Sequence, residues 1–190
     1  MANNYIENQT FENINFSAQQ FEIGNYEDCT FINCSFQKVE LSEADFSECH
    51  FEDCDFSLAT ITHTAFKNVV FERCKLLGLH FEHCNPFLLA MHFKSCQLNL
   101  ASFYQMNLKN CSFNQCDLKE ADFVQANLSG VKITQSDLTG ALFDQTNLEK
   151  TDLRGAINLV LNPESNKITK AKISSDSLPG LLPQYQLYID

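Results

Sequence analysis

Nine cysteines are the residues of this 190-residue chain whose chemistry most readily serves metal binding or nucleophilic attack. Several stand five residues apart: Cys29 and Cys34, Cys49 and Cys54, and Cys111 and Cys116. A zinc site needs a convergent set of four ligands, whereas alanine and valine take the equivalent place in other repeats of the chain. An odd cysteine count without a secretory signal also argues against a disulfide framework. We therefore interpret all nine as reduced, buried thiols, and we predict no metal site.

The five histidines form no catalytic arrangement. No serine or cysteine nucleophile stands beside an acid that could orient a histidine. The six glycines form neither a G-x-G-x-x-G run nor a P-loop for phosphates. The histidines are His50, His63, His80, His83 and His92. We therefore predict that the protein is not an enzyme and has no catalytic residue and no cofactor.

The charge is acidic and uneven along the chain. The net charge is −11; residues 1–60 contain 12 acids and one base, Lys38, whereas residues 61–190 contain 12 of each. Such a surface repels nucleic acids and anionic lipids. No apolar stretch approaches the roughly 18 residues of a membrane span, and the chain start lacks a basic region followed by an apolar one. We expect a cytoplasmic protein that binds neither nucleic acid nor membrane directly.

A period of five residues organises the chain. Every fifth residue is large and apolar in two uninterrupted series, from Ile6 to Phe81 and, after a shift of two residues, from Leu88 to Leu153. The series contain 16 and 14 of these centre positions, and 16 of the 17 phenylalanines occupy them. The residue two before each centre is usually small, and all nine cysteines stand there. Both positions are therefore predicted to point inward.

A period of five matches neither a strand nor a helix, so the chain must turn a corner in each repeat. We predict an all-β fold, a right-handed quadrilateral parallel β-helix with a short C-terminal hairpin or helix tail. Four repeats would form one turn of about 20 residues, and successive turns would pair through parallel hydrogen bonds about 4.8 Å apart. Thirty repeats would then give a rod roughly 36 Å long.

The repeats resemble the A-[DN]-L-x-x signature of the pentapeptide-repeat family. Clear examples are ADFSE (44–48), CDLKE (116–120) and ANLSG (126–130), and the resemblance covers about 150 residues. The C-terminal segment is similar to the ends of gyrase-protecting members, the Qnr-type and microcin-immunity-type proteins. This resemblance implies a rod that mimics duplex DNA, engages DNA gyrase or topoisomerase IV, and pairs with a second rod through its tail. The chain lacks the long projecting loops of the Qnr type.

The shift between the two series divides the chain. We predict an N-terminal part of the β-helix (1–84), a frame-shifting kink (85–87), a C-terminal part (88–156) and a capping and dimerisation tail (157–190). Pro86 removes a backbone donor and so favours a bulge here. Phe87 stands outside the pattern. It is interpreted either as an exposed anchor for a partner or as a side chain folded over the irregularity.

The tail carries more apolar residues than one rod end needs. A turn is predicted at residues 162–166, followed by a short helix that starts near Ser175 or Asp176. The tail is interpreted both as a lid over the last turn and as a homodimer interface. The predicted interface residues are Leu178, Leu181, Leu182, Tyr185, Leu187 and Ile189.

The acidic residues of the first 60 positions fall on three of the four predicted sides. The net charge of −11 over about three turns, or roughly 14 Å, gives about one charge per 1.3 Å, against about one per 1.7 Å in duplex DNA. Solubility alone can also favour acidic repeat surfaces. The predicted partner-binding residues are Glu22, Glu40, Glu43, Asp45, Glu48, Glu52 and Asp53.

Two functions remain open at this point. The first is a DNA-mimicking protein that binds a type II topoisomerase and modulates it or protects it from a toxin or quinolone. The alternative is a structural or scaffolding module with an unrelated protein partner. The acidic surface together with the tail favours the first.

Overall fold

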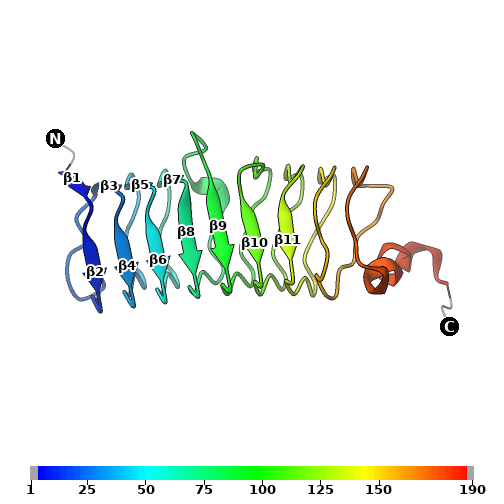
Figure 1. The fold of residues 1–190 in the computed structure, drawn as a ribbon, viewed down its shortest axis with the longest axis horizontal. Helices are drawn as coiled ribbons and strands as arrows, with labels where there is room; N and C mark the ends of the chain where they lie inside the picture. Colours follow the sequence, from blue (N-terminus) through cyan, green and yellow to red (C-terminus); the bar gives the residue numbers. More distant parts are fainter. Residues whose placement is uncertain (1–3, 188–190) are drawn as a thin grey trace.

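Strands stack on two sides of a square coil in the computed structural model, which describes residues 4–187 (Figure 1). In the first parallel sheet the strand order is β1-β3-β5-β7, and in the second it is β2-β4-β6-β8-β9-β10-β11. The strands of the first sheet are β1 (Asn4–Glu7), β3 (Gly24–Glu27), β5 (Asp45–Ser47) and β7 (Ala65–Lys67). Those of the second are β2 (Thr10–Glu12), β4 (Thr30–Ile32), β6 (His50–Glu52), β8 (Val69–Glu72), β9 (Met91–Lys94), β10 (Ser112–Asn114) and β11 (Lys132–Thr134). Paired residues are 20 apart, as in Phe31 and Phe51, so the predicted parallel β-helix is confirmed.

Most corners of the coil are made by a residue in the left-handed backbone region. This residue stands two positions after the centre, as in Asp28 (φ 49°), Gln105 (φ 59°) and Gly130 (φ 76°). No valine, isoleucine or threonine has a positive φ among the described residues. Branching at Cβ makes that conformation costly, whereas Asn, Asp, Gly and long unbranched side chains tolerate it better. The left-handed corners are therefore formed by residues that are not β-branched, and Ile23, which stands two positions after Phe21, does not adopt this conformation.

In repeats that form no strand, an asparagine or aspartate directly before the centre residue stabilises the turn that follows. The side-chain oxygen of Asp122 accepts the backbone N–H of Val124 at 2.8 Å, and Asn147 does the same for Glu149 at 3.1 Å. This local bond satisfies an N–H group that the turn-to-turn bonds do not use. The D or N of the repeat signature is thus a turn residue, and its carboxylates are partly engaged in the fold.

Aromatic columns fill the interior. Phe31, Phe51 and Phe71 stack with centroid distances of 4.7 and 5.2 Å, and all three are fully buried. Stacked, offset rings add a favourable contact beyond the burial of their apolar area. The nine thiols are also buried, as predicted. The Sγ of Cys74 donates to the carbonyl of Phe51, and the hydroxyl of Thr151 donates in the same way to Leu128.

The frame shift is a bulge on one side of one turn. Phe71 pairs with Phe93, so this turn has 22 residues instead of 20. The prediction that Leu88 is a centre is wrong: Leu88 is 63% exposed with φ 56°. The period-five position is Pro86, and the chain bulges outward directly after it. Leu89 and Met91 are buried in place of Leu88. The bond before Pro86 is trans.

The coil continues beyond Leu153. Backbone N–H groups of Leu148 and Leu153 donate to Lys167 and Lys172, so a further turn stacks on the rod past the boundary expected at residue 156. The period is hidden there because Asn158 and Pro163 stand at centre positions. The turn predicted at residues 162–166 lies within this last coil.

Short 3₁₀-helices follow the coil and close its C-terminal end (Figure 1). These are η2 (Ser175–Leu181) and η3 (Pro183–Tyr185), while η1 (Phe81–His83) lies before the bulge. The carbonyl of Gly180 accepts the N–H of Leu161 at 3.0 Å, and the hydroxyl of Ser177 donates to Ala156 at 3.1 Å. Within residues 4–187 no helix has the length and apolar character of a membrane span.

Candidate protein-interaction site

The first turns present most of their acids at positions that point away from the core. Glu22, Glu40, Glu43, Glu48 and Asp53 are exposed. The other two predicted residues, Asp45 and Glu52, are half-buried. The repeat geometry explains this, because the residue before each centre and the two residues after it point away from the core. All seven predicted acids therefore reach the surface of the rod.

Neighbouring turns hold several of these carboxylates in place. Asn4 donates to Glu22 at 3.1 Å, and Asn68 donates to Glu48 at 2.5 Å. The hydroxyl of Tyr5 donates to Glu27, and this hydrogen bond raises the pKa of Tyr5 to about 12. Each bond fixes the position of the carboxylate on the rod. The first turns thus carry an ordered array of negative charges.

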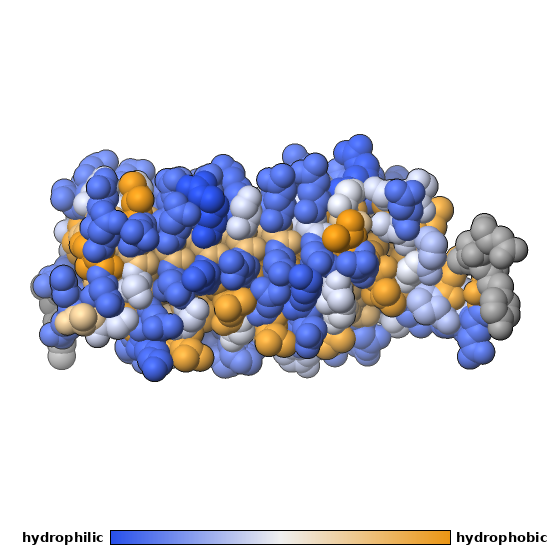
Figure 2. All heavy atoms as spheres, turned by 90° about the horizontal axis from the view of Figure 1, so that it is seen from below, coloured by the Kyte–Doolittle hydropathy of each residue, from blue (hydrophilic) through white to orange (hydrophobic). Residues whose placement is uncertain are grey.

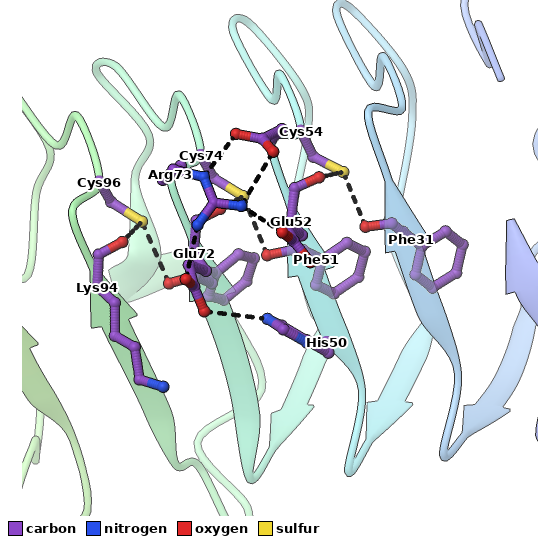
Figure 3. A network of polar contacts seen from close by, with 12 residues as sticks. Phe31, His50, Phe51, Glu52, Cys54, Glu72, Arg73, Cys74, Lys94 and Cys96 are labelled. Atoms are coloured by element: carbon purple, nitrogen blue, oxygen red, sulfur yellow. Dashed lines mark hydrogen bonds and ion pairs between the residues drawn. The ribbon is translucent and has the colours of Figure 1, made fainter. Parts of the chain in front are cut away.

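Bases of the fourth turn close the acidic region. Arg73 donates to Asp53 at 2.9 Å and to Glu72 at 2.6 Å, and it also pairs with Glu52 (Figure 3). Its carboxylate partners hold the pKa of Arg73 above its usual range, with Asp53 the main cause. Lys67 pairs with Asp45 in the same way.

These ion pairs were missed by counting charges along the sequence. Asp53 and Arg73 are 20 residues apart, which is one full turn of the coil. The five-residue period was therefore enough to predict this ion pair, because residues 20 apart in the sequence lie directly above one another on successive turns. The consequence is that three of the seven predicted partner-binding acids, Asp45, Glu52 and Asp53, are engaged in ion pairs within the protein, with two positive charges from Lys67 and Arg73 shared among them and Glu72.

Acids without an ion pair are most numerous in the first two turns, and Glu48 and Asp55 add two more in the third. Residues 4–43 contain seven acids and one base, a net charge of −6. Two turns span roughly 10 Å, which gives about one charge per 1.7 Å. Duplex DNA also carries about one charge per 1.7 Å. The ion pairs reduce the net negative charge of the third turn, so the acidic surface is densest over the first two turns, where its charge spacing is close to that of DNA.

The cysteines and histidines of the described residues form no metal site and no exposed thiol site. Within the described residues no three His, Cys, Asp or Glu side chains gather as metal ligands. Burial raises the pKa of the Cys111 and Cys116 thiols to about 12, so both are protonated and shielded at neutral pH. Among the histidines, His80 lies 2.9 Å from Glu82 and stacks on His83, whereas His50 contacts Glu72 at 3.7 Å.

Separate apolar side chains lie exposed on the polar surface. The lower face of the rod is mostly hydrophilic with separate apolar side chains along it (Figure 2). Phe87 is 66% exposed, so it does not fold over the irregularity as the alternative interpretation held.

The tail divides the six predicted interface residues between two roles. Leu178, Tyr185 and Leu187 are each more than half exposed, whereas Leu181 packs against the core as part of the lid. Leu182 is half-buried. Ile189 lies outside the described residues.

Comparison with known proteins agrees with this architecture. The family description "Pentapeptide repeat region" matches residues 4–81, 44–123 and 80–157. The chain therefore belongs to the pentapeptide-repeat family. No curated protein matches the sequence.

Solved structures show the same coil. A trypsin-treated variant of QnrB1, a plasmid-mediated fluoroquinolone resistance protein, is similar with 19% identity and a TM-score of 0.53, over 98% of this chain and 92% of that one. A second trypsin-treated QnrB1 variant has 17% identity and a TM-score of 0.46, over 98% and 100% of the two chains. HetL from Nostoc sp. strain PCC 7120, involved in heterocyst differentiation regulation, has 17% identity and a TM-score of 0.36, over 88% and 86%. At 19% identity and a TM-score of 0.53, the first of these similarities shows the fold alone.

Proposed function

We propose that this chain is a non-enzymatic binding protein whose first two turns mimic the charge of duplex DNA. The partner would be a type II topoisomerase, DNA gyrase or topoisomerase IV, which the rod modulates or protects from a toxin or quinolone. The observation that carries the proposal is the net charge of −6 over residues 4–43, spaced about as densely along the rod as phosphates along DNA.

Rigidity supports this proposal. A DNA-binding groove of a protein is lined with basic side chains that match the regular spacing of the phosphates. The stacked turns supply a stiff surface whose carboxylates are held by neighbours such as Asn4 and Asn68. A preorganised surface loses little conformational entropy on binding. Binding driven by such charges weakens steeply as salt rises.

The tail favours a homodimer. Leu178, Tyr185 and Leu187 present apolar area beyond what the lid uses. Pairing two rods through these C-terminal ends keeps the two acidic ends apart, which lowers their mutual repulsion. Sedimentation of the full chain against a chain ending at Ser174, which retains the last coil, tests this: a dimer should become a monomer. Two monomers would remove the end-to-end arrangement.

Supercoiling by purified gyrase and topoisomerase IV, with and without a quinolone, tests the main proposal. The intact rod should change the activity or its drug sensitivity at micromolar concentration. The triple variant Glu12→Gln, Asp28→Asn and Glu43→Gln should lose at least tenfold in potency. The matched control is Glu120→Gln, Asp144→Asn and Glu149→Gln in the C-terminal part, which removes the same charge and should act like the intact rod.

Two results would contradict the proposal. Equal loss in both triple variants would indicate a net-charge effect without a site in the first turns. An intact rod that affects neither enzyme would favour the alternative, a scaffolding module with an unrelated partner. The exposed side chain of Phe87 is the observation that supports this alternative.

A further inference from the structure

Three backbone hydrogen bonds normally join two successive turns on each side of the coil. Where the turns of Leu98 and Leu118 meet, Asp117 donates to Cys96 at 2.9 Å, Leu98 donates to Asp117 at 2.8 Å, and Leu100 donates to Lys119 at 2.9 Å. The same three bonds recur on other sides with the numbers moved by five. They define what a complete side of the rod looks like.

All three bonds are missing beside the bulge, as they also are where the turns of Phe21 and Leu41 meet in the described coil. The equivalent bonds beside the bulge would join Asn107 N–H to Cys84 C=O, position 86 N–H to Asn107 C=O, and Leu88 N–H to Lys109 C=O; none is formed among residues 4–187. Pro86 has no N–H to donate. Leu88 has moved outward with the bulge, which separates the two edges. Two donors and three acceptors of the backbone are therefore left open around one gap.

A hollow of about 680 Å³ occupies this gap. Its lining includes Cys84, Leu88, Asn107 and Lys109, which carry the open backbone groups, together with the apolar side chains of Leu89 and Met106. Ligand pockets in proteins commonly measure about 300–1,000 Å³. The hollow thus combines open backbone groups with apolar side chains.

One carboxylate oxygen at the hollow also lacks a partner. Glu82 lines the hollow, and its Oε1 accepts from His80 at 2.9 Å. Its Oε2 is buried and has no hydrogen-bond partner among the described residues. A buried carboxylate oxygen favours a donor, and a basic side chain is the strongest one available.

We propose that this hollow is a second interaction site, which binds an extended peptide segment of a partner protein. The peptide main chain would pair with the open backbone groups of Asn107 and Leu88, as in other recognition by strand addition. One apolar side chain would contact Leu89 and Met106, and a neighbouring lysine or arginine would reach Glu82. Exposed Phe87 stands in the chain between Pro86 and Leu88, which both line the hollow. The site lies outside the acidic first turns and does not depend on their function.

Selection from phage-displayed random linear heptapeptides on the immobilised full chain tests this inference. Enriched sequences should combine an apolar residue with a nearby lysine or arginine. Synthetic copies should slow amide hydrogen exchange at Asn107 and Leu88 in the ¹⁵N-labelled protein. Binding should weaken at least tenfold in Met106→Trp, which fills the hollow, and about three- to tenfold in Glu82→Gln.

A deletion of Phe87 and Leu88 restores a 20-residue turn and should abolish binding. Phe113→Leu, a conservative core change one turn away, controls for general destabilisation and should bind normally. No enriched peptide, or enriched peptides that bind all variants equally, would overturn the inference. The inference would also be overturned if the full chain forms a dimer and this dimer is lost both in the Met106→Trp variant and on removal of residues 183–190. The tail of a second copy would then be the occupant of the hollow.

Discussion

The N-terminal and C-terminal parts of the rod share one interior pattern but differ in the charge of their exteriors. Eleven of the first 16 centres are phenylalanine, against five of the 13 from Phe93 to Leu153, yet both parts keep the same spacing and corners. The first 60 residues carry 12 acids and one base, whereas the remaining residues carry equal numbers. The inward positions and the corners therefore define the fold, and the charge of the outward side chains can differ between the two parts without disturbing it.

The largest expected difference between the two parts lies in their cores. Phe51→Ala should lower the free energy of unfolding by about 3–5 kcal/mol, because a buried ring and two stacking contacts are lost. Leu128→Ala should cost about 2–4 kcal/mol, since Leu128 is equally buried but has no aromatic stack. Urea denaturation measures both. Leu58→Ala, at an exposed corner, is the control, and a cost there equal to that of Phe51→Ala would contradict the inward and outward assignment.

The next effect concerns the cap. A Cβ added at Gly180 would lie 1.7 Å from the carbonyl oxygen of Leu159, so Gly180→Ala must displace η2 and break its bond to Leu161. We expect a loss of about 2 kcal/mol, limited to the tail. Limited proteolysis should then cut near residue 175 much faster while the coil stays intact.

Gly130→Ala is the matched change inside the C-terminal coil. Its added Cβ meets no atom within 4 Å, and only the positive φ of 76° opposes it. It should cost about 1 kcal/mol and leave the tail protected. Equal proteolysis of both variants would show that η2 is not held by the close approach at Gly180.

A smaller effect on stability is expected when an acid with an ion pair in the C-terminal part, Asp152, is compared with an acid without one in the N-terminal part, Asp28. The hydrogen bonds from Arg154 lower the pKa of Asp152 from 3.8 to about 2. Because the folded pKa is depressed, the stabilisation is present above pH 4 and is lost as pH falls through 2. Asp152→Asn should therefore cost about 1 kcal/mol at pH 7 and almost nothing at pH 2. Asp28→Asn should leave the stability of the protein at pH 7 unchanged. Thermal unfolding of both variants at pH 7 and pH 2 measures this, and an equal loss of stability in both at pH 7 would contradict the account.

The smallest effect on stability is expected at Arg73, which ends the acidic region. Arg73→Gln should change the free energy of unfolding by less than about 1 kcal/mol, because its ion pairs are largely exposed. It should extend the acidic surface into the third turn and strengthen salt-sensitive binding to a basic partner. Unchanged binding would indicate that Glu52 and Asp53 lie outside the contact surface.

The five-residue period predicted the coil, its inward positions and the burial of the cysteines, because each is a local consequence of a corner every fifth residue. It misplaced Leu88, since spacing alone does not show at which residue a bulge leaves the coil. It also hid the last turn, where Asn158 and Pro163 stand at centres. The ion pairs of Arg73 required residues 20 apart to be compared, and the open bonds beside Pro86 required the fold itself.

Competition between DNA and the rod tests the proposed DNA mimicry most directly. A fluorescent DNA duplex bound to gyrase should be displaced by the intact rod, with potency that falls as salt rises from 50 to 200 mM, and the Glu12, Asp28 and Glu43 triple variant should displace it at least tenfold less well. Simultaneous binding of duplex and rod, or displacement that ignores both salt and the triple substitution, would contradict DNA mimicry by the first two turns.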